Sequence, residues 1–168
     1  MVLLESSTLE YGKAICDFDL ADTVSGRNIT NKDLNKDIVV IAFICNHCPY
    51  VVRIAENFSA LAAKTNDFVN WIAISANDPG YREDDSPENM SKFAAKYNFN
   101  FPYLFDESQE VARAFGAVCT PDIFVYKQGK LAYHARFEDL ERAIEDLKTG
   151  NKISFPDKVS AGCSIKWK

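Results

Sequence analysis

Two cysteines separated by two residues stand where the residue pattern changes from strand-like to helix-like. Cys45 and Cys48 follow an unbroken, β-branched apolar run over residues 38–44 and precede residues 51–62, whose apolar positions recur at helical spacing. The free N–H groups and the dipole at the start of a helix stabilise a thiolate, the nucleophilic form of cysteine. This placement predicts thiol–disulfide exchange, in which Cys45, one turn earlier and more exposed, attacks a disulfide and Cys48 resolves the mixed disulfide.

Two residues next to this pair are also candidates for a role. His47 lies between the cysteines, where a protonated imidazole would stabilise the thiolate. A solvent-facing residue of the first helical turn is an equally good interpretation of His47. Pro49 fits the first turn of a helix, where its missing N–H costs no hydrogen bond. His47 is therefore a candidate supporting residue, and Pro49 is explained by the helix start.

The elements that must position the pair follow an α/β pattern. Strand-like residues 38–44 and 68–74 flank the helix at 51–62, which indicates two parallel strands joined by a right-handed crossover. Further along, the sequence predicts a helix starting at Ser86-Pro87, a short helix over 111–115 closed by Gly116, a β-hairpin of 123–126 and 131–135, and a helix over 140–147 closed by Gly150. We therefore expect a mixed central sheet with helices on both faces, and an added N-terminal β-hairpin with its turn around Ser25-Gly26.

Length and composition favour a single domain. The chain has 168 residues, with no internal repeat, low-complexity stretch or Pro/Gly/Ser linker that would mark a domain boundary. We expect one domain over residues 1–168, ending in a short irregular tail from about residue 151.

The order of these motifs resembles that of a known superfamily. A strand, the Cys45-Asn46-His47-Cys48 motif, a helix, and then Thr120-Pro121 before an antiparallel strand resemble the thioredoxin superfamily. Segments 14–20, 43–51 and 162–168 are similar to its redoxin branch, which contains peroxiredoxin-like proteins of the alkyl hydroperoxide reductase and thiol-specific antioxidant type. The resemblance covers nearly the whole chain and implies a thioredoxin-like fold.

The resemblance also implies roles for individual residues. Cys45 would be the nucleophile and Cys48 the resolving thiol; Pro121 would be a cis-proline facing both, and Thr120 would offer its backbone to a substrate strand. Thioredoxin itself has a Trp where Ile44 stands here, and a buried Asp in the preceding strand. Because residues 38–44 contain no carboxylate, the proton acceptor for Cys48 is left unassigned.

The other cysteines and one charged run have several interpretations. Under the resemblance Cys119 lies beside the pair, as an alternative disulfide partner, a third sulfur ligand or a buried inert thiol. Cys163, in the tail, is either a C-terminal resolving thiol or a packed residue, and Cys16 is a strand residue. The acidic run at 82–85 predicts a solvated loop before a helix.

Three functions remain open on this evidence. The first is a thiol–disulfide oxidoreductase acting on protein or small-molecule disulfides. The second is a thiol peroxidase with Cys48 as the peroxidatic thiol, because Cys48-Pro49 resembles the Cys-Pro of peroxiredoxins, although Cys45 replaces the threonine expected three residues earlier. The third is a non-enzymatic metal or iron–sulfur protein using Cys45, Cys48, Cys119 and His47.

Charge and cysteine usage restrict the partners and the compartment. A formal net charge of −5 without a basic stripe makes nucleic acid and anionic membranes poor partners. Five irregularly spaced cysteines argue against a secreted disulfide framework, and neither a signal peptide nor a run of about 20 apolar residues is found, so we expect a cytoplasmic protein. We expect no cofactor or metal; the expected partners are protein or low-molecular-weight thiols and disulfides, peroxides for the second function, and a reductant such as thioredoxin or glutathione.

Overall fold

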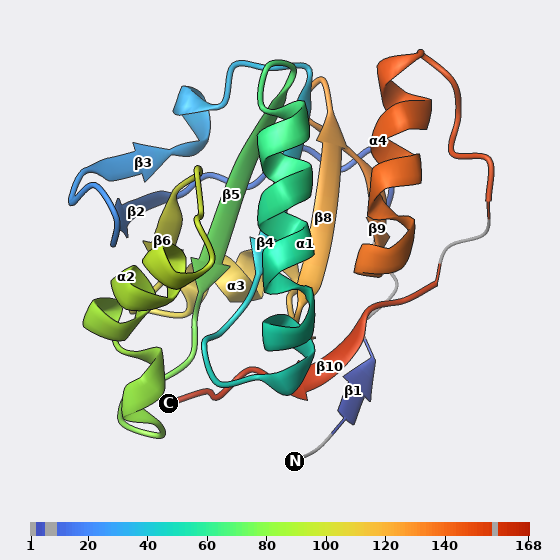
Figure 1. Ribbon diagram of the computed structural model, residues 1–168. Helices are drawn as coiled ribbons and strands as arrows, with labels where there is room; N and C mark the ends of the chain where they lie inside the picture. The colour runs from blue at the N-terminus through green and yellow to red at the C-terminus, as the bar shows by residue number, and fades with distance from the viewer. Residues whose placement is uncertain (1–2, 6–9, 156–157) are drawn as a thin grey trace.

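The computed structural model describes residues 3–5, 10–155 and 158–168, and its main element is a mixed sheet (Figure 1). The sheet is seven-stranded in the order β3-β2-β6-β5-β4-β8-β9. Its strands are β2 (Asp19–Asp22), β3 (Asn28–Thr30), β4 (Ile38–Phe43), β5 (Val69–Ser75), β6 (Tyr103–Phe105), β8 (Asp122–Lys127) and β9 (Lys130–Ala135). β2 and β3 form the expected N-terminal hairpin, which extends one edge of the sheet.

Strand β4 is the centre of this sheet and leads to the cysteine pair. All six of its residues are buried, as the unbroken apolar run predicts for a strand covered on both faces. β4 runs parallel to β5 and antiparallel to β8, so that Phe43 at its end is paired with both Ile74 and Asp122. The residues that follow β4 and those that precede β8 therefore meet at the same edge of the sheet.

Helices cover both faces of the sheet, as predicted. α1 (Pro49–Thr65) and α4 (Leu140–Lys148) lie on one face and α3 (Glu110–Phe115) on the other, while α2 (Pro87–Lys96) lies beside β6 (Figure 1). Alternate residues of β4 serve the two cores, since Val40 packs with the α1 and α4 side and Phe43 packs against Phe115 of α3. Short 3-10 helices lie at η1 (Asn31–Asp33), η2 (Glu83–Asp85) and η3 (Phe137–Asp139).

The predicted helix ends are confirmed. α1 begins at Pro49, and the Ser86 hydroxyl accepts a hydrogen bond from the Asn89 N–H at the start of α2. α3 ends at Gly116, whose φ of 75° lies in the left-handed region that a helix C-terminus uses.

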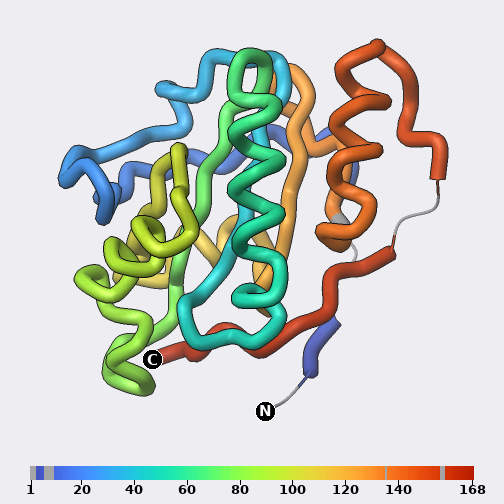
Figure 2. Tube along the Cα trace, in the orientation of Figure 1, coloured from blue at the N-terminus to red at the C-terminus, as the bar shows by residue number. Residues whose placement is uncertain are grey.

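The C-terminal tail differs from the expectation of irregular structure. It contains β10 (Ala161–Ser164), which pairs with β1 (Leu3–Glu5) on one side and with β7 (Cys119–Thr120) on the other. Figure 2 shows this segment passing beneath the start of α1. This strand was not predicted because Ala-Gly-Cys-Ser has no β-branched residue and because both of its partner strands are remote in the chain.

Other single-residue expectations are corrected. Cys16 lies before β2 rather than within a strand, and its thiol donates to the Ala114 carbonyl oxygen at 3.3 Å.

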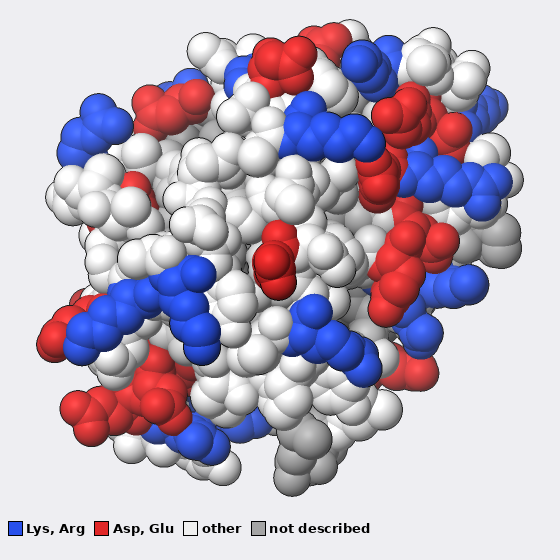
Figure 3. Space-filling view, viewed as in Figure 1, with Lys and Arg blue, Asp and Glu red and all other residues white. Residues whose placement is uncertain are grey.

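In the part of the chain that the structure describes, no helix is long and apolar enough to cross a membrane. Acidic and basic side chains are interspersed on the face of the molecule seen in Figure 3.

Candidate active site

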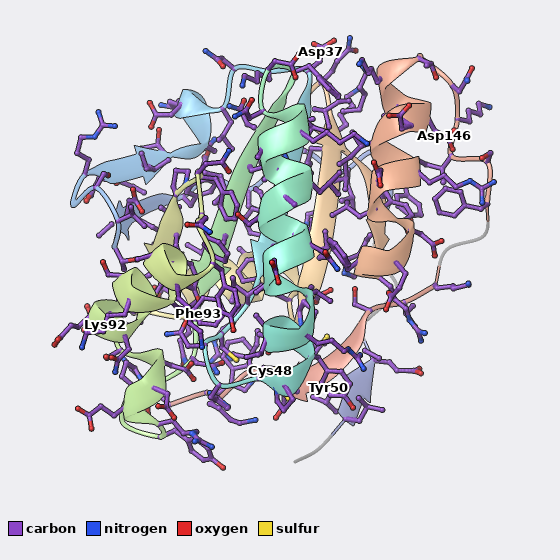
Figure 4. The ribbon with its side chains drawn as sticks, viewed as in Figure 1. Asp37, Cys48, Tyr50, Lys92, Phe93 and Asp146 are labelled. Carbon is purple, nitrogen blue, oxygen red and sulfur yellow. The ribbon has the colours of Figure 1, made fainter. Side chains whose placement is uncertain are left out.

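The two cysteines lie in the connection between β4 and α1. β4 ends at Phe43, Cys48 is the N-cap of α1, and the Cys48 carbonyl oxygen accepts the Val52 N–H at 3.0 Å. Figure 4 shows Cys48 at the start of this helix. Both cysteines are reduced and both are 0% exposed, so the expectation that Cys45 is the more exposed thiol is wrong.

Thr120 contacts both cysteines from the opposite side. Its peptide bond to Pro121 is cis, as the resemblance implies. The Thr120 hydroxyl lies 3.3 Å from the Cys45 sulfur, and the Thr120 carbonyl oxygen lies 3.3 Å from the Cys48 sulfur, where it accepts a hydrogen bond when Cys48 is a thiol. The backbone edge that the resemblance assigns to a substrate strand is occupied by β10, because Thr120 is paired with Cys163.

Cys163 is a third thiol of the site. Its sulfur lies 3.0 Å from the Cys48 sulfur, and its side chain is buried. The sequence left open whether Cys163 is a resolving thiol or a packed residue, and the structure places it against the pair. The Cys48 sulfur therefore contacts Thr120 and Cys163, and the Cys45 thiol is the group with the largest effect on its pKa.

Asp85 supplies a buried carboxylate beside Cys45, whereas the acceptor that the sequence left unassigned was one for Cys48. Its side chain, from η2, is fully buried and accepts hydrogen bonds from the Asn46 backbone N–H at 2.8 Å and the Asn77 side-chain amide at 2.9 Å. The His47 Nδ1 lies 2.5 Å from the same carboxylate. The solvated loop predicted for 82–85 is thus wrong for Asp85, because these partners satisfy a buried carboxylate.

The imidazole of His47 is only 11% exposed, so the solvent-facing interpretation of His47 is wrong. Its ring nitrogen is paired with the Asp85 carboxylate. The Cys45 sulfur, the His47 ring nitrogen and the Asp85 carboxylate oxygen all lie within 4.8 Å of one another. A buried carboxylate within 4.8 Å can accept a proton from the Cys45 thiol through one bridging water. Asp85 lies 40 residues after Cys45 in the chain, outside the strand before the cysteines, so the sequence of that strand did not indicate it.

The pKa values of the two thiols shift in opposite directions. Hydrogen bonds lower the pKa of Cys48, and the Cys45 thiol makes the largest contribution. Cys163, the Val51 N–H and the Thr120 hydroxyl lower this pKa further, whereas burial raises it. The pKa of Cys45 is raised by that same hydrogen bond to Cys48, by burial and by the negative charge of Asp85. These directions favour Cys48 over Cys45 as the thiol that ionises first.

The metal hypothesis loses its proposed ligand set. Among residues 3–5, 10–155 and 158–168, the one group of His, Cys, Asp and Glu ligand atoms that all lie within 4.8 Å of one another is Cys45, His47 and Asp85. Neither Cys48 nor Cys119 belongs to this group. The Cys119 sulfur lies 4.0 Å from the Pro121 carbonyl oxygen, on the strand that pairs with β10.

Sequence reasoning also missed a buried ion pair next to the cis-proline. The Asp122 carboxylate lies 2.6 Å from His134 Nε2, and both side chains are at most 4% exposed. His134 stacks on Phe124 with ring centroids 4.3 Å apart. This pair joins β8 to β9 directly after Pro121 and so supports the backbone that faces the cysteines.

Comparison with known proteins places the chain in a family. Residues 11–134 match the model of the AhpC/TSA family. An uncharacterized conserved protein from Geobacillus kaustophilus is 36% identical with a TM-score of 0.97, and the match covers 100% of this chain and 97% of that one. A hypothetical protein from Sinorhizobium meliloti 1021 is 32% identical with a TM-score of 0.94, covering 98% of each chain.

More distant structures share the fold. A secreted disulfide oxidoreductase from Mycobacterium tuberculosis is 23% identical with a TM-score of 0.59, over 68% of this chain and 79% of that one. No curated protein matches the sequence significantly. The chain has a thioredoxin-like fold and belongs to the AhpC/TSA family, within the redoxin branch of the thioredoxin superfamily.

Proposed function

We propose that the protein is a thiol–disulfide oxidoreductase whose redox couple is the Cys45–Cys48 dithiol and disulfide. The observation that carries this proposal is the position of both thiols at the start of α1, beside the cis peptide bond before Pro121. There the Thr120 hydroxyl lies 3.3 Å from the Cys45 sulfur and the Thr120 carbonyl oxygen lies 3.3 Å from the Cys48 sulfur. Two cysteines separated by two residues at the start of a helix can form a disulfide within one turn. Membership of a redoxin family supports this class of chemistry.

The pKa directions support Cys48 as the thiolate that attacks first. The sequence assigns attack to Cys45, but its hydrogen bond to Cys48, burial and the charge of Asp85 raise the pKa of Cys45. The pKa of Cys48 is instead lowered, chiefly by the Cys45 thiol. In the proposed order the Cys48 thiolate attacks one sulfur of a substrate disulfide and expels the other as a thiolate.

Cys45 then resolves the mixed disulfide. Its thiol gives its proton to the Asp85 carboxylate, and the resulting thiolate attacks the Cys48 sulfur and expels the second substrate thiolate. The dithiol is thereby oxidised to a Cys45–Cys48 disulfide while one substrate disulfide is reduced. His47 and Thr120 are supporting residues, because they position Asp85 and the Cys45 sulfur respectively.

A thiol peroxidase is the second candidate, and the low pKa of Cys48 favours it specifically. A peroxide oxygen attacked by the Cys48 thiolate would leave a sulfenic acid and release an alcohol or water. Attack by Cys45 on that sulfenic acid would release water and form the same disulfide. Pro49 directly after Cys48 matches the peroxiredoxin pattern, while Cys45 in place of a threonine departs from it.

Single cysteine replacements separate these two functions. We would measure the reduction of a small-molecule disulfide and the consumption of hydrogen peroxide by wild-type protein, Cys45→Ser, Cys48→Ser and the control Cys16→Ser. The oxidoreductase predicts that Cys48→Ser abolishes disulfide reduction, that Cys45→Ser slows it because the resolving thiol of the pair is lost, and that Cys16→Ser keeps full activity. Unchanged disulfide reduction in Cys48→Ser would reject the proposal, and fast peroxide consumption that depends on Cys48 would favour the peroxidase.

Burial of the pair also bears on the substrate. Because Cys45 and Cys48 are 0% exposed, we propose small-molecule thiols and disulfides ahead of proteins as the first partners to test. A reductant such as thioredoxin or glutathione completes the proposed cycle.

A further inference from the structure

A pocket opens beside the buried pair at the C-terminal segment. Its volume of about 390 Å³ falls within the roughly 300–1,000 Å³ of small-molecule sites. It lies between the start of α1, the loop that leads to η2, and β10, and it is lined by His47, Pro49, Tyr81, Arg82, Cys163, Ser164 and Lys166. Figure 2 shows the C-terminal segment reaching this loop after passing beneath α1.

Cys163 connects this pocket to the redox pair. The thiol lines the pocket and its sulfur lies 3.0 Å from the Cys48 sulfur, whereas neither Cys45 nor Cys48 lines the pocket. A molecule in the pocket can therefore reach Cys163 more directly than it can reach the pair itself.

The pocket carries positive charge near Cys163. The Lys166 ammonium donates to the Ser164 carbonyl oxygen and hydroxyl, both at 2.8 Å. Because Ser164 directly follows Cys163, these bonds hold the ammonium close to Cys163. Arg82 is paired with Asp84 at 2.9 Å, so its charge is balanced locally, and the His47 ring nitrogen lies 2.5 Å from the Asp85 carboxylate. Lys166 is thus the lining cation that can attract an anion and stabilise a thiolate at Cys163.

The placement of Cys163 depends on a close approach between two backbones. β10 is paired with β7 so that Cys163 lies opposite Thr120. A Cβ atom at the preceding residue, Gly162, would lie 2.0 Å from the Thr120 carbonyl oxygen, so this approach requires glycine. The fold thereby brings Cys163 to the backbone edge where the resemblance expects a substrate strand.

We propose that Cys163 is a third redox-active thiol, which carries the disulfide from the buried Cys45–Cys48 pair to the pocket, where a small anionic thiol reduces it. This inference rests on the proposed function and names the class of its reductant. The Cys163 thiolate, after losing its proton to solvent, attacks the Cys48 sulfur of the Cys45–Cys48 disulfide. A Cys48–Cys163 disulfide forms, and Cys45 leaves as a thiolate that takes up a proton.

The small thiol then completes the reduction from the pocket. One molecule, as its thiolate, attacks the Cys163 sulfur, forms a mixed disulfide and releases Cys48 as a thiolate. A second molecule attacks the mixed disulfide and releases Cys163, so two small thiols are oxidised to one disulfide and the protein returns to three thiols.

Oxidation of the pair itself makes Cys163 more reactive. In the reduced site, burial and then the hydrogen bond and negative charge of Cys48 raise the pKa of Cys163 to about 12, while Lys166 lowers it. When Cys48 enters a disulfide its negative charge is lost, and Lys166 remains. Cys163 therefore becomes a better nucleophile when there is a disulfide for it to attack.

The first test maps the disulfides of the oxidised protein by mass spectrometry of peptides. Wild-type protein oxidised with a stoichiometric thiol oxidant is expected to contain both the Cys45–Cys48 and the Cys48–Cys163 disulfides, and Cys45→Ser is expected to contain Cys48–Cys163. Oxidised protein in which Cys163 is always recovered as an alkylated thiol would overturn the inference. Since wild-type protein is used, this test does not depend on a variant folding.

The second test measures how fast the oxidised pair is reduced by glutathione, which is anionic, and by 2-mercaptoethanol, which is neutral. Cys163→Ser is expected to slow reduction of the Cys45–Cys48 disulfide by both thiols about tenfold or more, since the relay step is lost. Cys16→Ser is the matched control and is expected to behave as wild type. Lys166→Gln is expected to slow reduction by both thiols, since Lys166 lowers the pKa of Cys163, and to slow reduction by glutathione severalfold more than reduction by 2-mercaptoethanol.

Comparing Cys163→Ser with wild type distinguishes a wrong relay from a wrong oxidoreductase assignment. A Cys45–Cys48 disulfide that forms and is reduced equally fast in Cys163→Ser and in wild type would reject the relay and leave the oxidoreductase intact. A Cys45–Cys48 disulfide that forms in neither protein would reject the oxidoreductase itself. Equal slowing of both small thiols by Lys166→Gln would reject the anionic preference.

Discussion

The Cys48 sulfur lies 3.0 Å from the Cys163 sulfur, although 115 positions separate the two residues in the chain. The Cys45 thiol is the group that lowers the pKa of Cys48 most. The Cys48 sulfur at the start of α1 thus has two potential disulfide partners, Cys45 and Cys163. Cys45 lies beside a buried carboxylate, and Cys163 lines a pocket.

The Cys48 thiol is expected to titrate below the value of about 8.5 that an unperturbed cysteine shows. The Cys45 hydrogen bond is the largest cause of this lowered pKa, so Cys45→Ala should raise it. The ultraviolet absorbance of the thiolate, followed against pH, measures the midpoint in wild type, in Cys45→Ala and in the control Cys16→Ser. A midpoint that is the same with and without Cys45 would show that another group sets the pKa.

Stability should depend on pH with a defined sign. Because the pKa of Cys48 is lower in the folded than in the unfolded chain, the thiolate stabilises the fold fully above about pH 8.5, and this contribution is lost as the pH falls through the folded pKa. Urea unfolding of wild type and Cys48→Ala over this range measures it. The difference in free energy of unfolding between the two proteins should shrink toward acid pH, and a constant difference would contradict a thiolate at Cys48.

Asp85→Ala is expected to lower the free energy of unfolding by about 3 kcal/mol, because the Asn46 N–H, the Asn77 amide and His47 all lose a buried charged partner. Loss of the negative charge also removes one cause that raises the pKa of Cys45. Asp85→Asn, which retains part of the hydrogen bonding, should cost less stability and still slow the resolution step.

The matched control for Asp85 is its neighbour. The Asp84 side chain is 58% exposed and pairs only with Arg82 among the contacts that the structure gives for its carboxylate. Asp84→Asn should change the free energy of unfolding by no more than about 0.5 kcal/mol. Equal losses from the two neutralised residues would remove the special role assigned to Asp85.

Gly162→Ala is expected to separate β10 from β7, because the added Cβ would lie 2.0 Å from the Thr120 oxygen and 2.7 Å from its carbonyl carbon. Such overpacking against backbone typically costs about 1–3 kcal/mol. Gly80→Ala is the control, because its Cβ would meet only the flexible Asp78 side chain, at 3.2 Å. Unfolding curves and the yield of the Cys48–Cys163 disulfide should both fall for Gly162→Ala alone; retention of both would show that the close approach is not needed.

His134→Ala is expected to lower the free energy of unfolding by about 3 kcal/mol, because it removes the His134 ring from the buried Asp122 carboxylate and from its stack on Phe124. Thermal or urea unfolding measures this loss. The thiolate midpoint of Cys48 should stay unchanged, since neither residue is among the groups that shift the pKa of Cys48. A shifted midpoint would show that the Asp122–His134 pair also acts on the active site.

Local sequence patterns predicted the sheet, its helices and the location of the Cys45–Cys48 motif. Local patterns determine these elements, since each acts on residues only a few positions away and can be predicted from the sequence. They include the apolar run at 38–44 and the cap residues Ser86, Pro87 and Gly116. Two groups of the site were not predictable in this way. Asp85 reaches Cys45 from η2, and Cys163 reaches Cys48 from β10.

Both exceptions depend on tertiary contacts rather than on local propensity. An acidic run before a helix normally faces solvent, and only the donors of Asn46, Asn77 and His47 make a buried Asp85 acceptable. Ala161–Ser164 has little β propensity, and only its pairing with β1 and β7 makes it a strand. The resemblance identified Cys45, Cys48, Thr120 and Pro121, but it placed a substrate where β10 lies.

The central claim is that Cys45 and Cys48 form a reversible redox couple. Equilibrating the protein in graded mixtures of reduced and oxidised glutathione, followed by alkylation and peptide mass spectrometry, measures it most directly. We predict that a Cys45–Cys48 disulfide appears and disappears reversibly along this series. Cys45 and Cys48 that remain alkylated thiols in every mixture would contradict the claim.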